Sequence, residues 1–163
     1  MEQTGMRIVA YRDLTPRWDI YKARTAGYMR WTYNYMLGPK ERNPFPDDPV
    51  VIGSQVHVKL FALAPNNIQP PHKHDEDVIF AVVTGRARFL EGPEARPVGE
   101  AGPLDCVYVP AGEFYASVNV GSEVFQAFVI RLPREQEFKA PYNIDFPRRS
   151  PTGVPRIEVP EVS

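Results

Sequence analysis

The stretch PPHKHDEDVIFAVVTG, Pro70 to Gly85, decides how the rest of the chain is organised. It contains His72 and His74, two of the three histidines, separated by one residue. Because alternate residues of an extended strand face the same way, the two imidazoles are expected to project side by side. Two neutral imidazoles presented together suit a transition-metal site, or a pair of proton carriers near neutral pH. The apolar run that follows predicts a strand packed on both sides.

Size and charge limit the classes of function. At 163 residues the chain is most simply one domain with a core of its own. Its 19 basic residues nearly balance its 20 acidic ones, for a net charge of -1, so no electrostatic argument favours a nucleic-acid or membrane partner. The first residues lack an apolar signal core, and a cytoplasmic location is therefore expected. Because Cys106 is the single cysteine, the chain has no internal disulfide or thiolate cluster.

Short apolar segments bounded by turn residues recur along the chain, which predicts an all-β sandwich or barrel. Trp31, Tyr33 and Tyr35 alternate, a strand pattern whose rings either pack a sheet face or line a ligand pocket. Residues 1–49 are expected to pack, as strands and a loop, on a barrel formed by 50–132, while 133–163 form an extended proline-rich tail. Strands are expected at 7–11, 27–36, 50–64 with a break at Gly53, 78–83, 86–90, within 104–112 and twice within 113–133, with a turn at 65–71 and a loop at 37–49.

Two motifs in this order resemble those of the cupin superfamily of small β-barrels, over roughly residues 50–132. The first family motif is HxH followed by a glutamate and a glycine, and here it reads His72-Lys73-His74, DED, VIFAVVT and Gly85. The second is Gly-Asp, Pro-x-Gly, a histidine and an asparagine, and here it reads Leu104-Asp105, Pro110-Ala111-Gly112, Tyr115 and Asn119. The resemblance implies an RmlC-like double-stranded β-helix, or jelly roll, in a homodimer that acts on a small molecule.

In that family the two histidines of the first motif, its glutamate and the histidine of the second motif bind one divalent ion. His72 and His74 match, but Val78 stands at the glutamate position and Tyr115 at the second-motif histidine. A one-residue bulge would bring Asp77 to the place of the missing carboxylate. A tyrosine is a poor ligand for most divalent ions, since its ordinary pKa is about 10.

Three interpretations follow. In the first, Fe, Mn, Ni or Zn is held by His72 and His74, with Asp77 or His57 completing the site, and supports dioxygenase or lyase/isomerase chemistry. In the second, the site is metal-free, and His72, His74 and Tyr115 act as acid and base groups. In the third, the barrel binds a ligand without catalysis. A metal-assisted enzyme is the leading prediction, with a substrate pocket lined by His57, Gln126, Trp31 and Tyr33.

Overall fold

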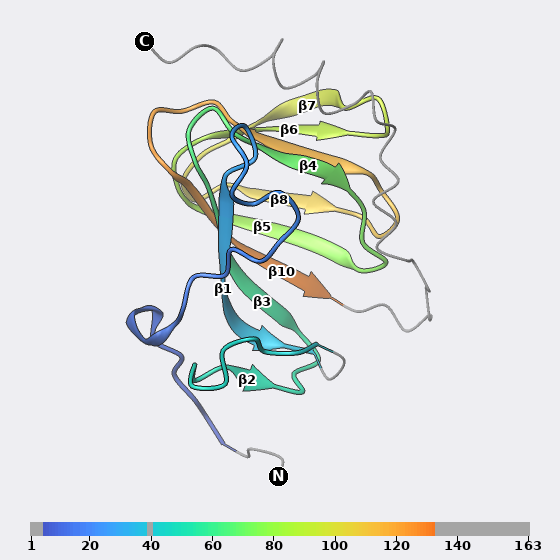
Figure 1. Cartoon of the computed structure of the whole chain (residues 1–163). Helices are drawn as coiled ribbons and strands as arrows, with labels where there is room; N and C mark the ends of the chain where they lie inside the picture. The colour runs from blue at the N-terminus through green and yellow to red at the C-terminus, as the bar shows by residue number, and fades with distance from the viewer. Residues whose placement is uncertain (1–4, 39–40, 133–163) are drawn as a thin grey trace.

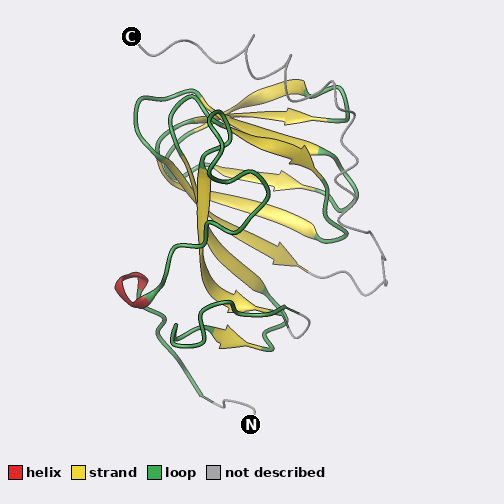
Figure 2. Cartoon of the chain, viewed as in Figure 1, coloured by secondary structure: helices red, strands yellow, loops and turns green. Residues whose placement is uncertain are grey.

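The computed structural model describes residues 5–38 and 41–132, and the predicted tail at 133–163 lies outside the described residues. Two sheets, antiparallel except for the parallel pairing of β1 with β2, pack face to face and form a jelly-roll barrel (Figures 1 and 2). The larger sheet has the order β2-β1-β3-β10-β5-β8 and the smaller one β4-β9-β6-β7. The elements are η1 (Tyr11–Asp13), β1 (Arg30–Leu37), β2 (Val51–Ile52), β3 (His57–Leu63), β4 (Ile68–His72), β5 (Asp77–Thr84), β6 (Ala87–Glu91), β7 (Arg96–Ala101), β8 (Cys106–Val109), β9 (Tyr115–Asn119) and β10 (Phe125–Leu132).

Alternation along the strands builds the core between the sheets. Phe61 of β3, Phe80 of β5 and Phe125 of β10 all point inward, and their rings meet edge to face around Phe61, at centroid distances of 6.3 and 6.4 Å. Phe89 of β6 closes the cluster from the smaller sheet, 5.1 Å from Phe80. Each fully buried phenylalanine contributes roughly 1.5–3 kcal/mol by leaving water. The core therefore fills the barrel at one end and leaves the other end to polar side chains.

Most predicted strands are confirmed, including the break at Gly53, whose φ of +80° separates β2 from β3. The strand expected at 7–11 is wrong, because residues 11–13 form the short helix η1 and no strand precedes β1 within the described residues. The turn expected at 65–71 is also wrong in part, since Pro70 and Pro71 lie inside β4. Proline fits there because β4 is an edge strand and its register with β9 is irregular between Gln69 and His72. The strand β7 was not foreseen.

The strand β5 is buried on one face rather than on both. Val78, Phe80 and Val82 enter the core, whereas Val83 on the opposite face is 44% exposed. The predicted aromatic face of β1 lies on this same outer side of the larger sheet, since Trp31 is paired with Ala62 and not with the inward-facing Phe61. Within the described residues no helix is long and apolar enough to cross a membrane.

The register brings the ends of several strands to one end of the barrel, which we call its mouth. Arg131 of β10 is directly opposite His57 of β3 on one side and Val78 of β5 on the other. In the smaller sheet, His72 at the end of β4 is directly opposite Tyr115 at the start of β9. All these positions are on the inward-facing side, so the mouth collects the polar residues that the core excludes.

Candidate active site

His72, His74 and Tyr115 form one wall of the mouth, which we call the neutral wall. Tyr115 is buried, and its ring centroid lies 4.5 Å from that of His72 and 6.2 Å from that of His74. The two imidazoles are 5.0 Å apart and almost perpendicular. His74 follows the end of β4, and its carbonyl accepts a 2.7 Å hydrogen bond from the Gly112 amide, which fixes the loop beside β9. The structure thus brings together the three residues that the two motifs singled out.

The tautomer of His72 is determined by its backbone partner. Its Nδ1 lies 2.7 Å from the Pro70 carbonyl oxygen, which can only accept, so Nδ1 carries the proton and Nε2 keeps its lone pair. Burial lowers the pKa of His72 to about 4, although the bond to Pro70 by itself would raise it. At neutral pH, His72 is a neutral imidazole with an available base at Nε2.

His74 has the opposite tautomer. Its Nδ1 lies 3.4 Å from Nη1 of Arg131, which can only donate, so Nδ1 is the acceptor and Nε2 holds the proton. Burial, together with the neighbouring His72 and the charge of Arg131, lowers the pKa of His74 to about 2. The neutral wall therefore contains one imidazole that presents a lone pair and one that presents an N–H group.

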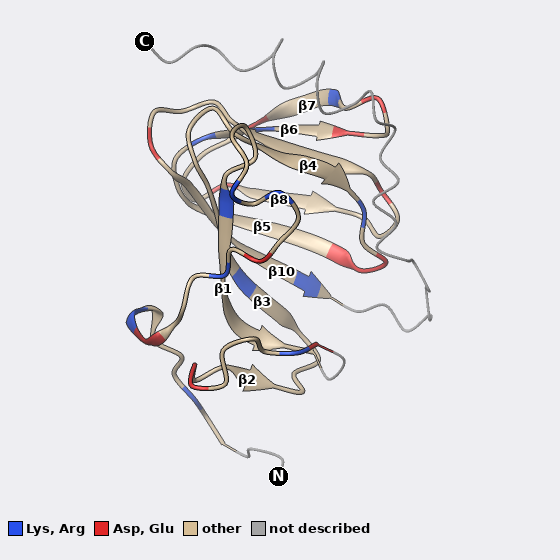
Figure 3. Ribbon diagram, in the orientation of Figure 1, with Lys and Arg blue, Asp and Glu red and all other residues tan. Residues whose placement is uncertain are grey.

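A second wall, which we call the charged wall, consists of Glu41, His57, Lys59 and Arg131. The cations lie on the neighbouring strands β3 and β10 (Figure 3), and Glu41 reaches them from the loop that follows β1. Arg131 is almost fully buried, contacts one Glu41 oxygen and lies 3.6 Å from Glu76. A guanidinium in such a place needs anionic partners, because a buried charge left alone is very costly.

Glu41 joins the three basic groups of this wall. Its Oε1 lies 3.0 Å from Nδ1 of His57 and also pairs with Arg131, while Oε2 is 3.8 Å from Lys59. Burial would raise the pKa of Glu41, but the hydrogen bond from His57 and the charges of Lys59 and Arg131 hold it well below its usual range. Because a carboxylate only accepts, His57 donates from Nδ1 to Glu41, and Nη2 of Arg131 lies against the ring, 2.9 Å from Nδ1 and 3.0 Å from Nε2.

Burial lowers the pKa of His57 to about 4 and, together with the charge of Arg131, that of Lys59 to about 8. His57 is consequently neutral at neutral pH, while most of the Lys59 population remains charged. The charged wall carries its positive charge on Arg131 and Lys59.

The donor set does not fit a divalent metal. Among residues 5–38 and 41–132, no three His, Cys, Asp or Glu side chains converge as a ligand set. A metal needs a lone pair from each imidazole, and on His74 the contact from Arg131 occupies that of Nδ1 while Nε2 holds the proton. The guanidinium also adds a positive charge beside the place that a cation would occupy.

Asp77 does not reach the histidines through a bulge. The pairing of β5 with β10 is regular from Asp77 through Ala81, and its irregularity lies instead between Gln126 and Ala127. Val78 therefore enters the core, and Asp77, one residue earlier, turns to the other face of the strand. Its carboxylate accepts a 2.9 Å hydrogen bond from the Ala111 amide, which ties β5 to the loop after β8.

Three of the four residues expected to line the pocket lie elsewhere. Gln126 alternates with the inward-facing Phe125 and Ala127, so it points to the outer face, where Thr84 donates to it at 3.3 Å. Trp31 stacks on Trp18 on that outer face, at 4.7 Å, and Tyr33 bonds Tyr11 there. The pocket prediction is wrong for these three because alternation fixes which residues share a face, without showing which face is inside. His57, the fourth residue expected to line the pocket, lies at the mouth of the barrel.

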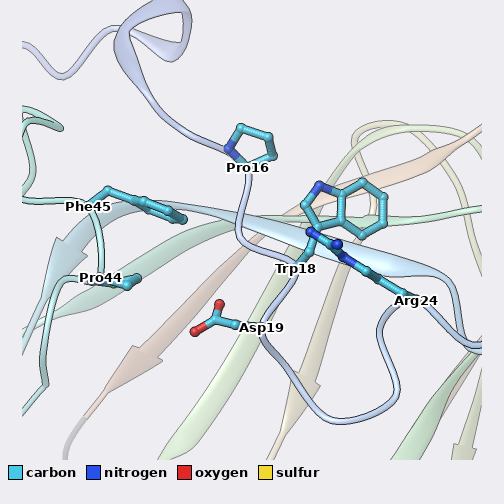
Figure 4. Close-up of a pocket in the computed structure, with 6 residues that line it drawn as sticks. All are labelled: Pro16, Trp18, Asp19, Arg24, Pro44 and Phe45. Atoms are coloured by element: carbon cyan, nitrogen blue, oxygen red, sulfur yellow. The ribbon is translucent and has the colours of Figure 1, made fainter.

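A surface hollow of about 360 Å³ lies apart from both walls (Figure 4). It is open to solvent between the segment that precedes β1 and the loop that follows it, and none of its lining residues belongs to either wall. Its lining residues are Pro16, Trp18, Asp19, Arg24, Pro44 and Phe45. We place the chemistry at the mouth, where the polar groups converge.

The charged wall contains the residues that sequence reasoning missed. The sequence does contain a signal for Arg131 and Lys59, because each continues an alternating apolar pattern on the inner face of its strand. Arg131 follows Phe125, Ala127 and Val129, and Lys59 precedes Phe61 and Leu63. A cation at an inward position of a core strand is expected to have a partner. Glu41 carries no such signal, since it lies in a proline-rich loop far from its partners in the sequence.

No protein-family model and no curated protein sequence matches the chain. Solved structures do match its fold. KdgF from Halomonas sp. superposes with a TM-score of 0.56 and 14% identity, over 81% of this chain and 97% of that one. The polyketide cyclase RemF from Streptomyces resistomycificus superposes with a TM-score of 0.56 and 20% identity, over 83% of this chain and 88% of that one. A structure of the DMSP lyases RdDddP and RnDddQII superposes with a TM-score of 0.56 and 16% identity, over 74% of this chain and 57% of that one.

At these identities the comparisons establish the fold. Together with the two-sheet topology, they confirm the predicted jelly-roll barrel, a double-stranded β-helix.

Proposed function

We propose that this cupin-fold protein is a small-molecule enzyme that moves a proton on an organic substrate, in an isomerisation, cyclisation or lyase step, without routing that step through a metal. The observation that carries the proposal is the pair of neutral imidazoles with opposite tautomers at one mouth of the barrel. A base and an acid held together in this way are what proton transfer between two substrate atoms requires.

In this proposal His72 is the base. Its Nε2 lone pair takes a proton from a substrate carbon, and the Pro70 carbonyl stabilises the imidazolium that forms by accepting from Nδ1. Its depressed pKa keeps it unprotonated at neutral pH but makes it a weak base. The substrate C–H group must therefore be acidified by an adjacent carbonyl, whose oxygen gains negative charge as the proton leaves.

His74 and Tyr115 are the groups that answer that charge. The Nε2–H group of His74 and the phenol of Tyr115 can donate to the substrate oxygen, and both rings lie within 6.2 Å of each other across the same wall. Arg131 is a positioning residue, because its contact with Nδ1 of His74 maintains the donor tautomer. Removing such an oxyanion donor typically costs a factor of about 10²–10³ in turnover.

The names of two fold relatives are consistent with this class of reaction. One is a polyketide cyclase and the other a pair of DMSP lyases, and a general base can serve a cyclisation or a lyase step by removing a proton from the substrate. At 20% and 16% identity these names give no substrate for this chain, and we take only the reaction class from them.

The test is proton exchange in D2O. Wild-type protein, dialysed against EDTA, would be incubated with a panel of ketones, β-keto acids and thioesters, and deuterium uptake at the α-carbon followed by NMR. We expect catalysed exchange on at least one compound and a loss of about a hundredfold in His72→Asn. Lys73→Asn, one residue away, is the matched control and should retain the wild-type rate.

The same experiment distinguishes the metal-free proposal from the metal-assisted interpretation. If exchange appears only after Fe, Mn, Ni or Zn is restored, or if purified protein contains near-stoichiometric metal that His72→Asn loses, metal-free chemistry is wrong and the dioxygenase or lyase alternatives return. If no compound exchanges in wild type, the proposal of proton transfer at carbon is wrong, and the non-catalytic binding barrel takes its place.

We also propose that the protein is a homodimer. The outer face of the larger sheet is apolar, and Val83 and Tyr108 on it are 44% and 60% exposed, next to the exposed Cys106. Light scattering should give twice the mass of the chain, and Tyr108→Glu should give a monomer. A monomeric wild type would contradict the proposal.

A further inference from the structure

The charged wall has more positive groups around one carboxylate than a structural ion pair needs. Glu41 oxygens contact Arg131, accept from His57 at 3.0 Å and lie 3.8 Å from Lys59. Arg131 and His57 are almost fully buried, and both belong to adjacent core strands that fix their positions. The carboxylate, by contrast, comes from a loop, and the Glu41 side chain is 26% exposed. Buried donors on core strands around a partly exposed loop carboxylate describe a receptor with an occupant.

We propose that Arg131, Lys59 and His57 form a subsite for a carboxylate of the substrate, and that Glu41 fills this subsite when no substrate is bound. The inference rests on the proposed function, since it assigns the substrate class of the same site: a small organic acid. A substrate carboxylate would replace the Glu41 carboxylate and receive the same contacts from the guanidinium, the ammonium and the Nδ1–H group.

The geometry of Arg131 connects this subsite to the neutral wall. One terminal nitrogen, Nη2, contacts Glu41, while the other, Nη1, lies 3.4 Å from Nδ1 of His74. A carboxylate bound in place of Glu41 is therefore separated from His74 by the width of a guanidinium group. The carbons next to that carboxylate would extend towards the imidazoles, where a proton can be moved.

Charge balance favours an anionic ligand. Within the charged wall, Glu41 opposes two cations, Arg131 and Lys59. When Glu41 withdraws, Glu76 remains near Arg131 at 3.6 Å, and burial raises the pKa of Glu76, which weakens it as a counter-ion. The vacated subsite would thus hold excess positive charge in a partly buried place, where an uncharged ligand gives no compensation. A carboxylate matches the planar donors of a guanidinium better than a single-point anion does.

Because Glu41 and the substrate compete for one subsite, shortening Glu41 should tighten the binding of a carboxylate. The experiment is a ligand-observed NMR titration of benzoate and propionate, with benzamide and propionamide as uncharged controls of the same shape. We expect Glu41→Ala and Glu41→Gln to bind at least one of the two acids at least tenfold more tightly than wild type does. The two amides should bind all three proteins equally weakly.

Glu100→Ala is the matched control, because Glu100 of β7 also pairs with two arginines, Arg88 of β6 and Arg86 just before it, but the Arg86 side chain is 60% exposed. It should leave acid binding at the wild-type level. Adding Arg131→Gln or Lys59→Met to Glu41→Ala should weaken acid binding again by at least tenfold. The double variants remove both members of an ion pair with Glu41, although Glu76 loses its 3.6 Å partner in the Arg131 variant, and urea unfolding would confirm that both proteins fold.

Acid binding that does not tighten in Glu41→Ala, or that survives Arg131→Gln in that background, would overturn the subsite. Equal tightening for acids and amides would overturn it as well, since a merely emptied space admits both. These experiments measure binding and not turnover, so the subsite can be confirmed even when no proton exchange is found. Conversely, exchange on neutral ketones alone would support the proposed function and contradict this subsite.

Discussion

The two walls of the barrel mouth hold their polar groups by different means. The neutral wall rests on one backbone acceptor, the Pro70 carbonyl, and on burial that lowers the pKa of both imidazoles. The charged wall rests on side-chain ion pairs that converge on Glu41. The walls meet at Arg131, which belongs to the second and sets the tautomer of His74 in the first.

The difference shows how one fold can keep bases neutral beside a buried cation. Burial penalises a charged imidazole, and a neighbouring positive charge penalises it further, so the histidines stay unprotonated. The cation itself persists because Glu41 and Glu76 lie within ion-pair distance. Removing a member of one wall should therefore have consequences that differ in kind from removing a member of the other.

The largest effect is expected for Arg131→Met. It leaves the Glu41 carboxylate without its closest cation, and breaking a buried pair from one side costs about 3–5 kcal/mol of unfolding free energy. Because Glu41 is partly exposed, we expect the lower end of that range, measured by urea unfolding at pH 7. Arg86→Met, which breaks an exposed pair, should cost less than about 1 kcal/mol. Equal costs would show that the charged wall is an ordinary surface network.

Tyr115→Phe should separate catalysis from stability in the neutral wall. The ring remains in the core beside Phe80, at a centroid distance of 5.7 Å, so the packing is preserved. Loss of the phenol donor should reduce the exchange rate by about a hundredfold, as for other acid–base groups. Unchanged exchange would remove Tyr115 from the mechanism, and a large loss of stability would assign it to the fold instead.

Acid should protonate the three histidines and Glu41 in different pH windows. The folded-state pKa values of His57, His72 and His74 are about 4, 4 and 2, below the ordinary histidine value, so the unfolded chain takes up protons first. Their contribution is full above about pH 6.5 and falls as the pH decreases towards 4, by on the order of 5 kcal/mol between pH 7 and pH 5. Since the pKa of Glu41 is also depressed, its contribution is lost only below about pH 4.5.

Unfolding curves at a series of pH values would resolve the two windows. His57→Gln should flatten the slope between pH 7 and pH 5 and leave the steep loss below it. A slope in that upper window that does not change when any of the three histidines is replaced would mean that they are protonated normally in the folded protein.

The smallest effect is expected from the outer face. Gln126→Ala should change the exchange rate by less than about twofold and the stability by about 0.5 kcal/mol at most, because Gln126 is bonded only to Thr84 among its described contacts. A large loss of exchange with the fold intact would place a pocket on the outer face, next to Trp31, and would undo the assignment of chemistry to the mouth.

The sequence predicts the fold and half of the site. Proline and glycine punctuation, alternation and the two motifs lead to the barrel and to His72, His74 and Tyr115 because strand pairing is set by local pattern. The charged wall depends on long-range pairs, with Glu41 and Arg131 distant in sequence, and no local pattern encodes them. The misplacement of Trp31 and Gln126 has the same origin, since alternation cannot say which face of a sheet a second sheet will cover.

The most direct test of the site is the tautomeric state of the imidazoles. Long-range proton–nitrogen correlation spectra at pH 7 would contain three rings, because the chain has three histidines, and single substitutions would assign them. We expect all three to be neutral, with the proton on Nδ1 in His72 and His57 and on Nε2 in His74, and Arg131→Met to abolish the preference of His74. An imidazolium in the neutral wall, or the same tautomer on His72 and His74, would contradict the proposed acid–base pair.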